Sequence, residues 1–401
     1  MRVIYSFAVL RGLAMGIFSP IWILYLVHQG YDLLEIGLLG AVFEIAKLIF
    51  EVPSGTFADR YGIKTSIVGS FIFSVLTWAF FPFIDTFAIC ISAMILWALS
   101  DALISGSYET WITRLVDENK FGKVLMKNTQ LMVIGIIVGS LSSGYLYTLN
   151  PYLPFVLVVG LYLTLLIWMS FVKIPSIKNE ISNGPTHKES FIAIISYSLK
   201  FMFRKRRVFL IVIAGFFTAL VYDTISRYWQ PYMEGIGFSE EALGFIFASA
   251  AGVTLLLLGI TIKFEKKIDN NPYASLTILE SSTLALTLLL SIGFKPLGMI
   301  SMPILLAVED IRHPIEMNYL NKFFPESHKA TLFSLNSGVS ALGEVLSGII
   351  FGIIAVKLGL IATLIIASCC LLPAIIIYLV IPKIKDNSNN IQLDSASELK
   401  L

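Results

Sequence analysis

Charged residues are scarce in this chain of 401 residues. Asp, Glu, Lys and Arg make up 14% of it, whereas hydrophobic residues make up 56%. A soluble globular domain carries about a quarter charged residues, so the composition excludes an ordinary soluble protein. The formal net charge is only +2, and so small an excess indicates no nucleic-acid partner.

Cysteine and histidine are also rare, and neither occurs at the spacing of a metal site. All three cysteines lie in apolar runs, and the adjacent pair is poorly suited to a structural disulfide, so we expect reduced, buried thiols. The histidines are scattered, and no His-x-x-x-His, nucleophile-elbow or ATP-binding Gly-x-x-x-x-Gly-Lys-Ser/Thr pattern occurs. We therefore expect no metal, no cofactor and no enzyme activity. The residues concerned are Cys90, Cys369, Cys370, His28, His187, His313 and His328.

Long apolar runs dominate the rest of the chain. A helix needs about 20 apolar residues to cross the hydrocarbon core of a membrane. The first run follows the N-terminus without a small-residue cleavage site, so we interpret it as a retained span and not a signal peptide. Twelve runs fit this length, at residues 4–27, 33–57, 66–84, 88–112, 126–149, 152–172, 208–232, 241–262, 273–294, 297–320, 331–356 and 358–382.

The basic residues predict the orientation of these spans. Lys and Arg concentrate on the side where odd-numbered spans begin, whereas the opposite side holds only Lys295 and Lys357. Cytoplasmic loops carry the excess of Lys and Arg, so both termini are expected in the cytoplasm of a multi-pass protein of the inner (cytoplasmic) membrane.

The longest loop divides the spans six and six. We expect an N-terminal bundle (1–172), a cytoplasmic linker (173–207), a C-terminal bundle (208–382) and a disordered tail (383–401). The linker is polar at first, amphipathic from Phe191 to Phe203, and then basic from Arg204 to Arg207. A helix lying on anionic lipid at the inner leaflet is expected; a nucleic-acid patch is the alternative interpretation of the basic run.

A charged segment separates the second and third spans. The sequence Gly-Thr-Phe-Ala-Asp-Arg-Tyr-Gly-Ile-Lys occupies residues 55–64, and we expect a tight turn there. Gly55 permits close helix contact or a positive φ, and Gly62 permits a sharp reversal. Asp59 can interact with the partial positive charge of a helix N-terminus. We expect these charged residues to form a gate, and the neighbouring Glu51 to belong to it.

This segment resembles the shared motif of the major facilitator superfamily. That motif reads Gly-x-Leu-Ala-Asp-Arg/Lys-x-Gly-Arg/Lys-Arg/Lys; Phe57 replaces its Leu and Ile63 one basic position. Residues 321–334 are similar to a second family stretch, Pro-x-x-x-Arg-Ala-Thr-x-x-Ser. The matching motif positions are Gly55, Ala58, Asp59, Arg60, Gly62 and Lys64.

The resemblance implies an all-α membrane protein of twelve helices in two six-helix bundles. It also implies that Asp59 faces the start of the eleventh helix, near Ala330–Thr331, and holds the two halves together on the cytoplasmic side. The fifth span is similar to the pattern of drug antiporters, Gly-x-x-x-Gly-Pro-x-x-Gly-Gly, except that Ser140 and Ser143 replace a Pro and a Gly. Such spacing of small residues also permits close helix packing irrespective of function.

Ionisable residues within the spans are the candidates for function, because a charge at mid-membrane costs roughly 2.5–3.5 kcal/mol on insertion scales. In the second span, Glu44, Lys47 and Glu51 share one face; a structural ion pair is the alternative. In the tenth span, Glu309, His313 and Glu316 share a face beside Arg312, as a proton carrier requires. The alternative is an inner gate of Arg312 and Glu316 without a proton role.

Five more charges lie in other spans. Asp101 and Glu344 are isolated acids near mid-depth, each expected to be protonated, paired or facing water. Asp223 and Arg227 are spaced for an intrahelical salt bridge. Arg11 lies in the first span and is a possible partner of Glu109 or Asp101.

These features predict a secondary transporter that alternately exposes a central cavity to each side. The leading hypothesis is export of a small amphiphilic compound driven by the proton gradient, with Glu44, Asp101, Glu309 and Glu344 as carriers. A metabolite permease is the first alternative, and a transporter-like sensor that moves nothing is the second. We expect a small-molecule substrate, contact with membrane lipid, and a monomer.

Overall fold

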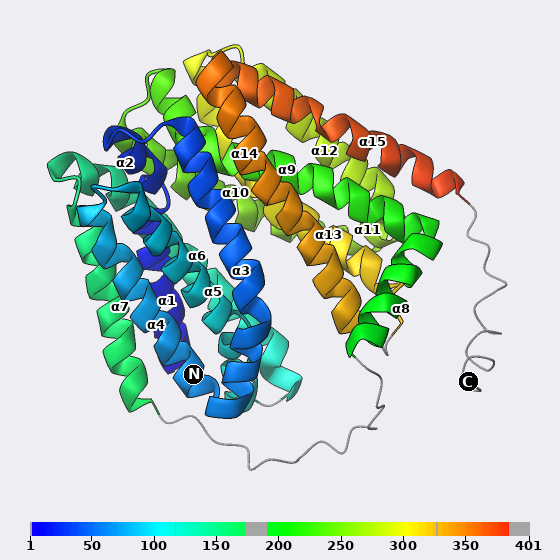
Figure 1. The fold of residues 1–401 in the computed structure, drawn as a ribbon, viewed down its shortest axis with the longest axis horizontal. Coiled ribbons are helices and arrows are strands. Elements are labelled where there is room, and N and C mark those ends of the chain that lie inside the picture. The colour runs from blue at the N-terminus through cyan, green and yellow to red at the C-terminus, as the bar shows by residue number, and fades with distance from the viewer. Residues whose placement is uncertain (1, 117, 173–190, 326–327, 385–401) are drawn as a thin grey trace.

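A computed structural model describes residues 2–116, 118–172, 191–325 and 328–384, and these residues are almost entirely helical. Figure 1 shows the helices of the N-terminal half side by side with those of the C-terminal half. The first part of the predicted linker (173–190) and the predicted tail from residue 385 lie outside the described residues.

The N-terminal half holds seven helices and a short 3-10 turn. The helix α1 packs on α6 and α7, α4 packs on α5 and α7, and α3 packs on α5. Aromatic side chains fill much of this core; the rings of Trp78 and Phe155, for example, stack with centroids 6.0 Å apart. The bounds are α1 Arg2–Phe18, α2 Trp22–His28, α3 Leu33–Tyr61, α4 Ile63–Phe80, η1 Phe81–Phe83, α5 Phe87–Leu115, α6 Glu118–Leu149 and α7 Leu153–Phe171.

The C-terminal half follows a single amphipathic helix, α8, which packs against α9 and α14. Within this half α9 packs on α14 and α15, and α13 packs on α10 and α12. The bounds are α8 Phe191–Arg204, α9 Arg206–Gly235, α10 Glu240–Lys263, α11 Glu265–Asn270, α12 Pro272–Leu290, α13 Lys295–Asn321, α14 Lys329–Cys369, α15 Leu371–Val380 and η3 Ile381–Lys383.

Among the described residues, nine helical segments are long and apolar enough to cross a membrane. The helices α3 and α13 are also long, at 29 and 27 residues, but carry several charged side chains. The last of the nine, Thr331–Lys383, bends at Gly359, where φ is +81°. This bend lies beside the predicted boundary between the last two spans, so the structure is consistent with twelve crossings.

Two details differ from the expectations. The first predicted span is interrupted at residues 19–21, which separate α1 from α2. The charged segment is mostly helical: α3 extends to Tyr61, and the reversal is confined to Gly62, whose φ is +92°. Apolar sequence ends near Phe57, but polar residues can continue a helix beyond the hydrocarbon core.

We call the end of the molecule that holds Gly62 the motif end. There, the Lys64 ammonium donates to the carbonyl of Ser170 at 2.7 Å, in the last turn of α7, where the helix dipole favours a positive charge. Gly55 faces open space. The side chains of Asp59, Arg60 and Glu51 are exposed.

The two halves meet tightly at the opposite end, which we call the closed end. It comprises residues 23–37, 144–147, 228–240 and 348–352. The helix α3 packs on α14, and α6 packs on α10. At the second contact, a Cβ added to Gly144 would lie 2.0 Å from the carbonyl oxygen of Glu240, so only glycine permits this approach. The small residues of α6 therefore do serve helix packing here.

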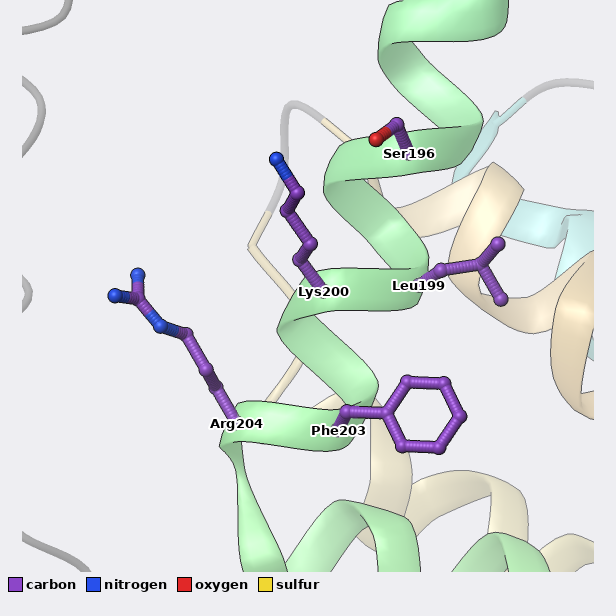
Figure 2. A pocket seen from close by; sticks show the side chains of 5 residues that line it. All are labelled: Ser196, Leu199, Lys200, Phe203 and Arg204. Carbon is purple, nitrogen blue, oxygen red and sulfur yellow. The ribbon is translucent and has the colours of Figure 1, made fainter.

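The helix α8 matches the predicted amphipathic segment. In Figure 2, Lys200 and Arg204 extend away from the side on which Leu199 and Phe203 project. The Phe203 side chain is 67% exposed. These four residues and Ser196 line a depression of about 370 Å³, which is a feature of one helix surface and not a site between helices.

Candidate functional site

A cavity of about 250 Å³ lies between the two halves, beneath the closed end. Its walls come from the α1–α2 connection, α2, α3 and α5 of the N-terminal half and from α9 and α10 of the C-terminal half. A site shared by the two halves is what alternating exposure requires. The lining residues are Ser19, Trp22, Ile23, Gly40, Phe43, Glu44, Met94, Trp97, Asp223, Ser226, Arg227, Trp229, Gln230 and Phe247.

Aromatic rings form much of the cavity wall. Trp97 of α5 lies edge-on to Trp22, with ring centroids 5.2 Å apart, and 5.1 Å from the ring of Phe43. On the other half, Trp229 stacks on Phe247 at 6.1 Å. Flat, apolar walls of this kind suit a hydrophobic or aromatic ligand. Tyr222 and Tyr228 are close to Asp223 in the sequence, but neither residue lines the cavity.

Glu44 lines this cavity and contacts Glu344 across the interface between the halves. Their carboxyl groups lie within hydrogen-bonding reach of each other, although one is on α3 and the other on α14. A hydrogen bond between two carboxyl groups needs a proton on one of them. The pair is therefore a place where a proton can be held between the two halves.

Asp223 and Arg227 form the predicted intrahelical salt bridge, with Nη2–Oδ2 at 2.5 Å. Ser347 of α14 also donates to the Asp223 carboxylate. The guanidinium of Arg227 lies directly against α3 at Gly40. A Cβ added to Gly40 would fall 0.9 Å from its Nη1 atom, so only glycine leaves room for it. This ion pair is thus a second polar link between α3, α9 and α14.

Lys47 pairs with Asp101, with Nζ–Oδ2 at 3.3 Å, and joins α3 to α5 within the N-terminal half. Both side chains are little more than two-fifths exposed. The suggested pairing of Arg11 with Asp101 or Glu109 is not present. Instead, the Arg11 guanidinium lies over the ring of Tyr108, 4.9 Å from its centroid, and Asp101 is paired with Lys47.

The tenth predicted span, α13, separates into two environments. Glu309 is half-buried and close enough to Glu44 and Asp223 for their charges to interact. His313 is exposed. Arg312 is buried and forms an ion pair with Glu316, and its Nε atom lies 3.8 Å from the buried Glu280 carboxylate of α12.

The Arg312 cluster lies inside the C-terminal half. Tyr222 of α9 donates to Glu280 at 3.3 Å and shares a hydrogen bond with Thr283 at 2.9 Å. All these partners belong to one half. The arrangement therefore supports a structural ion cluster within the C-terminal bundle and not a gate between the halves in this conformation.

Gln230 is a site residue that no sequence pattern indicated. Its Oε1 accepts from the backbone N–H groups of Ile23 and Leu24, both at 3.1 Å, and its amide donates to the Ser19 carbonyl at 2.8 Å. A side chain of α9 thus satisfies the backbone where α1 and α2 separate. The signal that the sequence offered for Gln230 was a single amide residue within an apolar span.

The predicted contact of Asp59 with the start of the eleventh helix is not formed in this conformation. Asp59 makes no hydrogen bond or ion pair with any residue that the structure describes. The motif ends of the two halves would have to approach for the contact to form, so it stays a prediction for a state with that end closed.

Comparison with solved structures supports the architecture. The nucleoside transporter NupG superimposes with a TM-score of 0.77 at 13% identity, covering 95% of this chain and 98% of that one. A bacterial homologue of the human lysosomal transporter Spinster, in an inward-facing and unoccupied conformation, gives a TM-score of 0.74 at 14% identity, with 95% of each chain covered. These likenesses establish a transporter fold and no more.

Sequence relatives place the chain more closely. It is 60% identical over 400 residues to the uncharacterized MFS-type transporter YxaM of Bacillus subtilis strain 168, and all of both chains is covered. It is 22% identical over 354 residues to the quinolone resistance protein NorA of Staphylococcus aureus strain MRSA252, covering 87% of this chain and 88% of NorA. The family model of the Major Facilitator Superfamily matches residues 4–311. The chain therefore belongs to the major facilitator superfamily of membrane transporters.

Proposed function

We propose that this protein exports a small amphiphilic compound across the cytoplasmic membrane in exchange for protons. The observation that carries the proposal is the contact between Glu44 and Glu344 beside the cavity. One proton satisfies this pair, whereas two ionised carboxylates in a low dielectric repel each other strongly. Because the two residues belong to opposite halves, loss of the proton favours separation of α3 from α14. Proton release is thereby coupled to the change of conformation.

The cavity chemistry suggests the class of substrate. Its aromatic walls favour a flat apolar body, and the carboxyl groups of Glu44 and Asp223 favour a positive charge. Arg227 already compensates Asp223, which leaves Glu44 as the group available to a cation. A hydrophobic cation that binds beside Glu44 would displace the shared proton. The similarity to NorA, a quinolone resistance protein, agrees with this class.

Glu44 and Glu344 are favoured over the other predicted carriers for a geometric reason. Asp101 is already paired with Lys47 at 3.3 Å within its own half, and Glu309 contacts no carboxyl group of the other half among the described residues. We assign both a supporting electrostatic role near the cavity.

A metabolite permease is the second candidate. Ser19 and Ser226 line the cavity, and their hydroxyl groups would suit a polar solute. The structural neighbour NupG is a nucleoside transporter, which supports this second candidate.

The test is transport in proteoliposomes with an imposed pH gradient. Hydrophobic cations, quinolones and nucleosides would be compared as substrates. We expect gradient-driven movement of the cations and quinolones, and we expect Glu344→Gln to lower it more than about tenfold, which corresponds to roughly 1.4 kcal/mol. The matched control is Glu241→Gln, an exposed carboxylate on α10.

Two outcomes would reject the proposal. Transport of the cations that does not depend on the gradient would exclude proton coupling, and transport of nucleosides alone would support the permease. If Glu44→Gln and Glu344→Gln kept full coupling while Glu309→Gln or Asp101→Asn lost it, the carrier assignment would move to those acids.

We further propose that the protein works as a monomer and that α8 lies at the lipid surface of the motif end. The exposed Phe203 and Leu199 would enter the lipid, and Lys200 would meet anionic head groups.

A further inference from the structure

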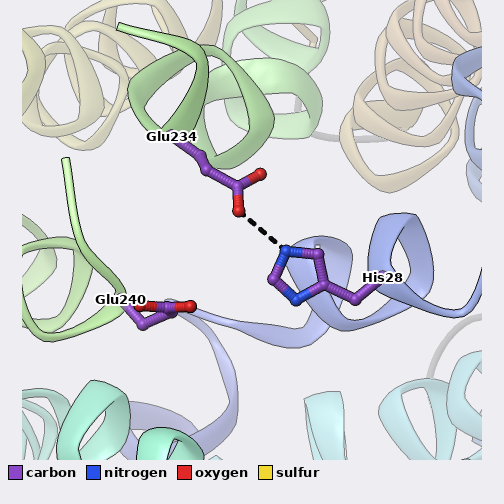
Figure 3. A group of neighbouring side chains, drawn as sticks. All are labelled: His28, Glu234 and Glu240. Carbon is purple, nitrogen blue, oxygen red and sulfur yellow. Dashed lines mark hydrogen bonds and ion pairs between the residues drawn. The ribbon is translucent and has the colours of Figure 1, made fainter. Parts of the chain in front are cut away.

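A histidine and two glutamates converge at the closed end, outside the cavity. Figure 3 shows the carboxyl groups of Glu234 and Glu240 directed toward the imidazole of His28. The Nε2 atom of His28 lies 2.7 Å from Glu234 Oε1, and one ligand atom from each of the three residues lies within 4.8 Å of the others. No metal or small-molecule role is attached to these residues by the transport cycle described above.

A hydrogen bond on the other ring nitrogen fixes the orientation of the His28 imidazole. Its Nδ1 atom makes a 2.8 Å hydrogen bond with the hydroxyl of Tyr147 on α6. In metal sites the non-ligating nitrogen of a histidine is commonly held by such a partner, which fixes the ring and the tautomer. When an ion replaces the proton between Nε2 and Glu234, the Tyr147 hydroxyl can accept from Nδ1–H, and the lone pair of Nε2 is available to the ion.

The charges of the cluster are unbalanced. Two carboxylates face one imidazole, and no lysine or arginine in the described part of the chain forms an ion pair with either of them. The side chains of His28 and Glu234 are 35% and 36% exposed, so an ion can reach them from the aqueous side. A divalent cation would neutralise the cluster.

We propose that His28, Glu234 and Glu240 bind a divalent transition-metal ion of the Zn²⁺ class and that the bound ion holds the two halves together at the closed end. Zinc accepts histidine nitrogens and carboxylate oxygens as ligands at about 2.0–2.2 Å, and a site with three protein ligands leaves the fourth position to water. The ion takes the place of the proton between Nε2 and Glu234, and that proton leaves to solvent.

The site exists in only one state of the transporter. His28 ends α2 in the N-terminal half, whereas Glu234 and Glu240 belong to α9 and α10 in the C-terminal half. Separation of the closed end would take the histidine away from both carboxylates. An ion that binds this state alone must shift the conformational equilibrium toward it, so zinc on this side should inhibit opening.

The first experiment measures zinc binding to the purified full chain without a histidine tag. Competition with a chromophoric chelator gives the affinity, and thermal unfolding gives the stabilisation. We expect one saturable site, an upward shift of the unfolding temperature, and an affinity at least about tenfold lower in His28→Gln and Glu240→Gln. Tyr147→Phe should weaken binding less and keep the stoichiometry. Glu241→Gln, the adjacent exposed carboxylate, is the matched control and should bind as the parent does.

A second experiment tests the effect on conformation. Spin labels at the exposed positions Asn150 and Ile292, one in each half, report the width of the closed end. We expect Zn²⁺ to remove the longer distances from the distribution, and His28→Gln to abolish that effect. Absence of saturable binding, equal binding by Glu240→Gln and Glu241→Gln, or binding that leaves the distances unchanged would each overturn the proposal.

Discussion

Gly37 of α3 and Gly348 of α14 touch through their backbones, although 311 residues separate them in the sequence. A Cβ added to Gly37 would lie 2.0 Å from the carbonyl oxygen of Gly348, and the reverse distance is 2.2 Å. The closed end therefore depends on the absence of two side chains. The contact lies close to Arg227, whose Nη1 atom is 3.5 Å from the Gly37 carbonyl.

We expect Gly348→Ala to weaken the closed end. The added methyl group must push α3 and α14 apart, and overpacking of this kind costs about 1–3 kcal/mol. Labelling of a cysteine placed in the cavity, from the closed side, would measure the opening. Gly338→Ala on the same helix is the control, because a Cβ there meets nothing within 4 Å. Equal labelling of the two variants would show that this contact does not seal the end.

Replacement of Gln230 by Leu should destabilise the break between α1 and α2. The backbone N–H groups of Ile23 and Leu24 lose their common acceptor in a buried place, and each unsatisfied group costs about 1–3 kcal/mol. The midpoint temperature of unfolding in detergent should fall clearly. Gln130→Leu, at an exposed position of α6, should leave it nearly unchanged. A small effect of both variants would mean that water replaces the lost acceptor.

Removal of the Arg312 guanidinium should be among the most damaging changes in the C-terminal half. Arg312→Met leaves Glu316 and Glu280 buried without their cation, and breaking a buried pair costs about 3–5 kcal/mol. Thermal unfolding and yield of folded protein are the measurements.

Two further variants test the interpretation of the Arg312 cluster. The triple change Arg312→Met, Glu316→Leu and Glu280→Gln should recover most of the stability, because no buried charge is left. Lys322→Met removes an exposed pair with Asp269 at 3.7 Å and should cost at most about 1 kcal/mol. If the triple variant were no better than Arg312→Met, packing and not charge would explain the loss.

The pair of Lys47 and Asp101 should show a small but measurable coupling. Both side chains are more than a third exposed, and solvent screens such pairs to about 0.2–1 kcal/mol. A double-mutant cycle with Lys47→Ala and Asp101→Ala, read by the free energy of unfolding, isolates this term. Purely additive effects would show that the 3.3 Å contact contributes nothing to stability.

Some parts of the site follow from local sequence. Asp223 and Arg227 are four residues apart on one helix, and this spacing alone brings their side chains together. The amphipathic helix α8 is likewise visible in its own pattern of apolar and basic residues. The reversal at Gly62 was predicted at the right residue, but its length was not, because hydropathy reports the membrane boundary and not the end of a helix.

Other parts depend on which helices become neighbours. Glu44 and Glu344, and His28 and Glu234, are pairs separated by 300 and 206 residues, and no periodicity connects them. Arg11 is an example of a residue whose partner the sequence did not predict. Asp101, one of its two expected partners, pairs with Lys47, and Arg11 lies over the ring of Tyr108.

The amino-acid sequence by itself determined that this is a helical membrane protein with a family motif after its second span. The physical reason is that apolar length and local charge are properties of short segments. Only the tertiary structure decided which acids lie within hydrogen-bonding reach across the two halves, which glycines let the halves touch, and where a histidine meets two carboxylates. Those features arise where α3 packs on α14 and α6 on α10, and packing between distant segments is set by the whole fold.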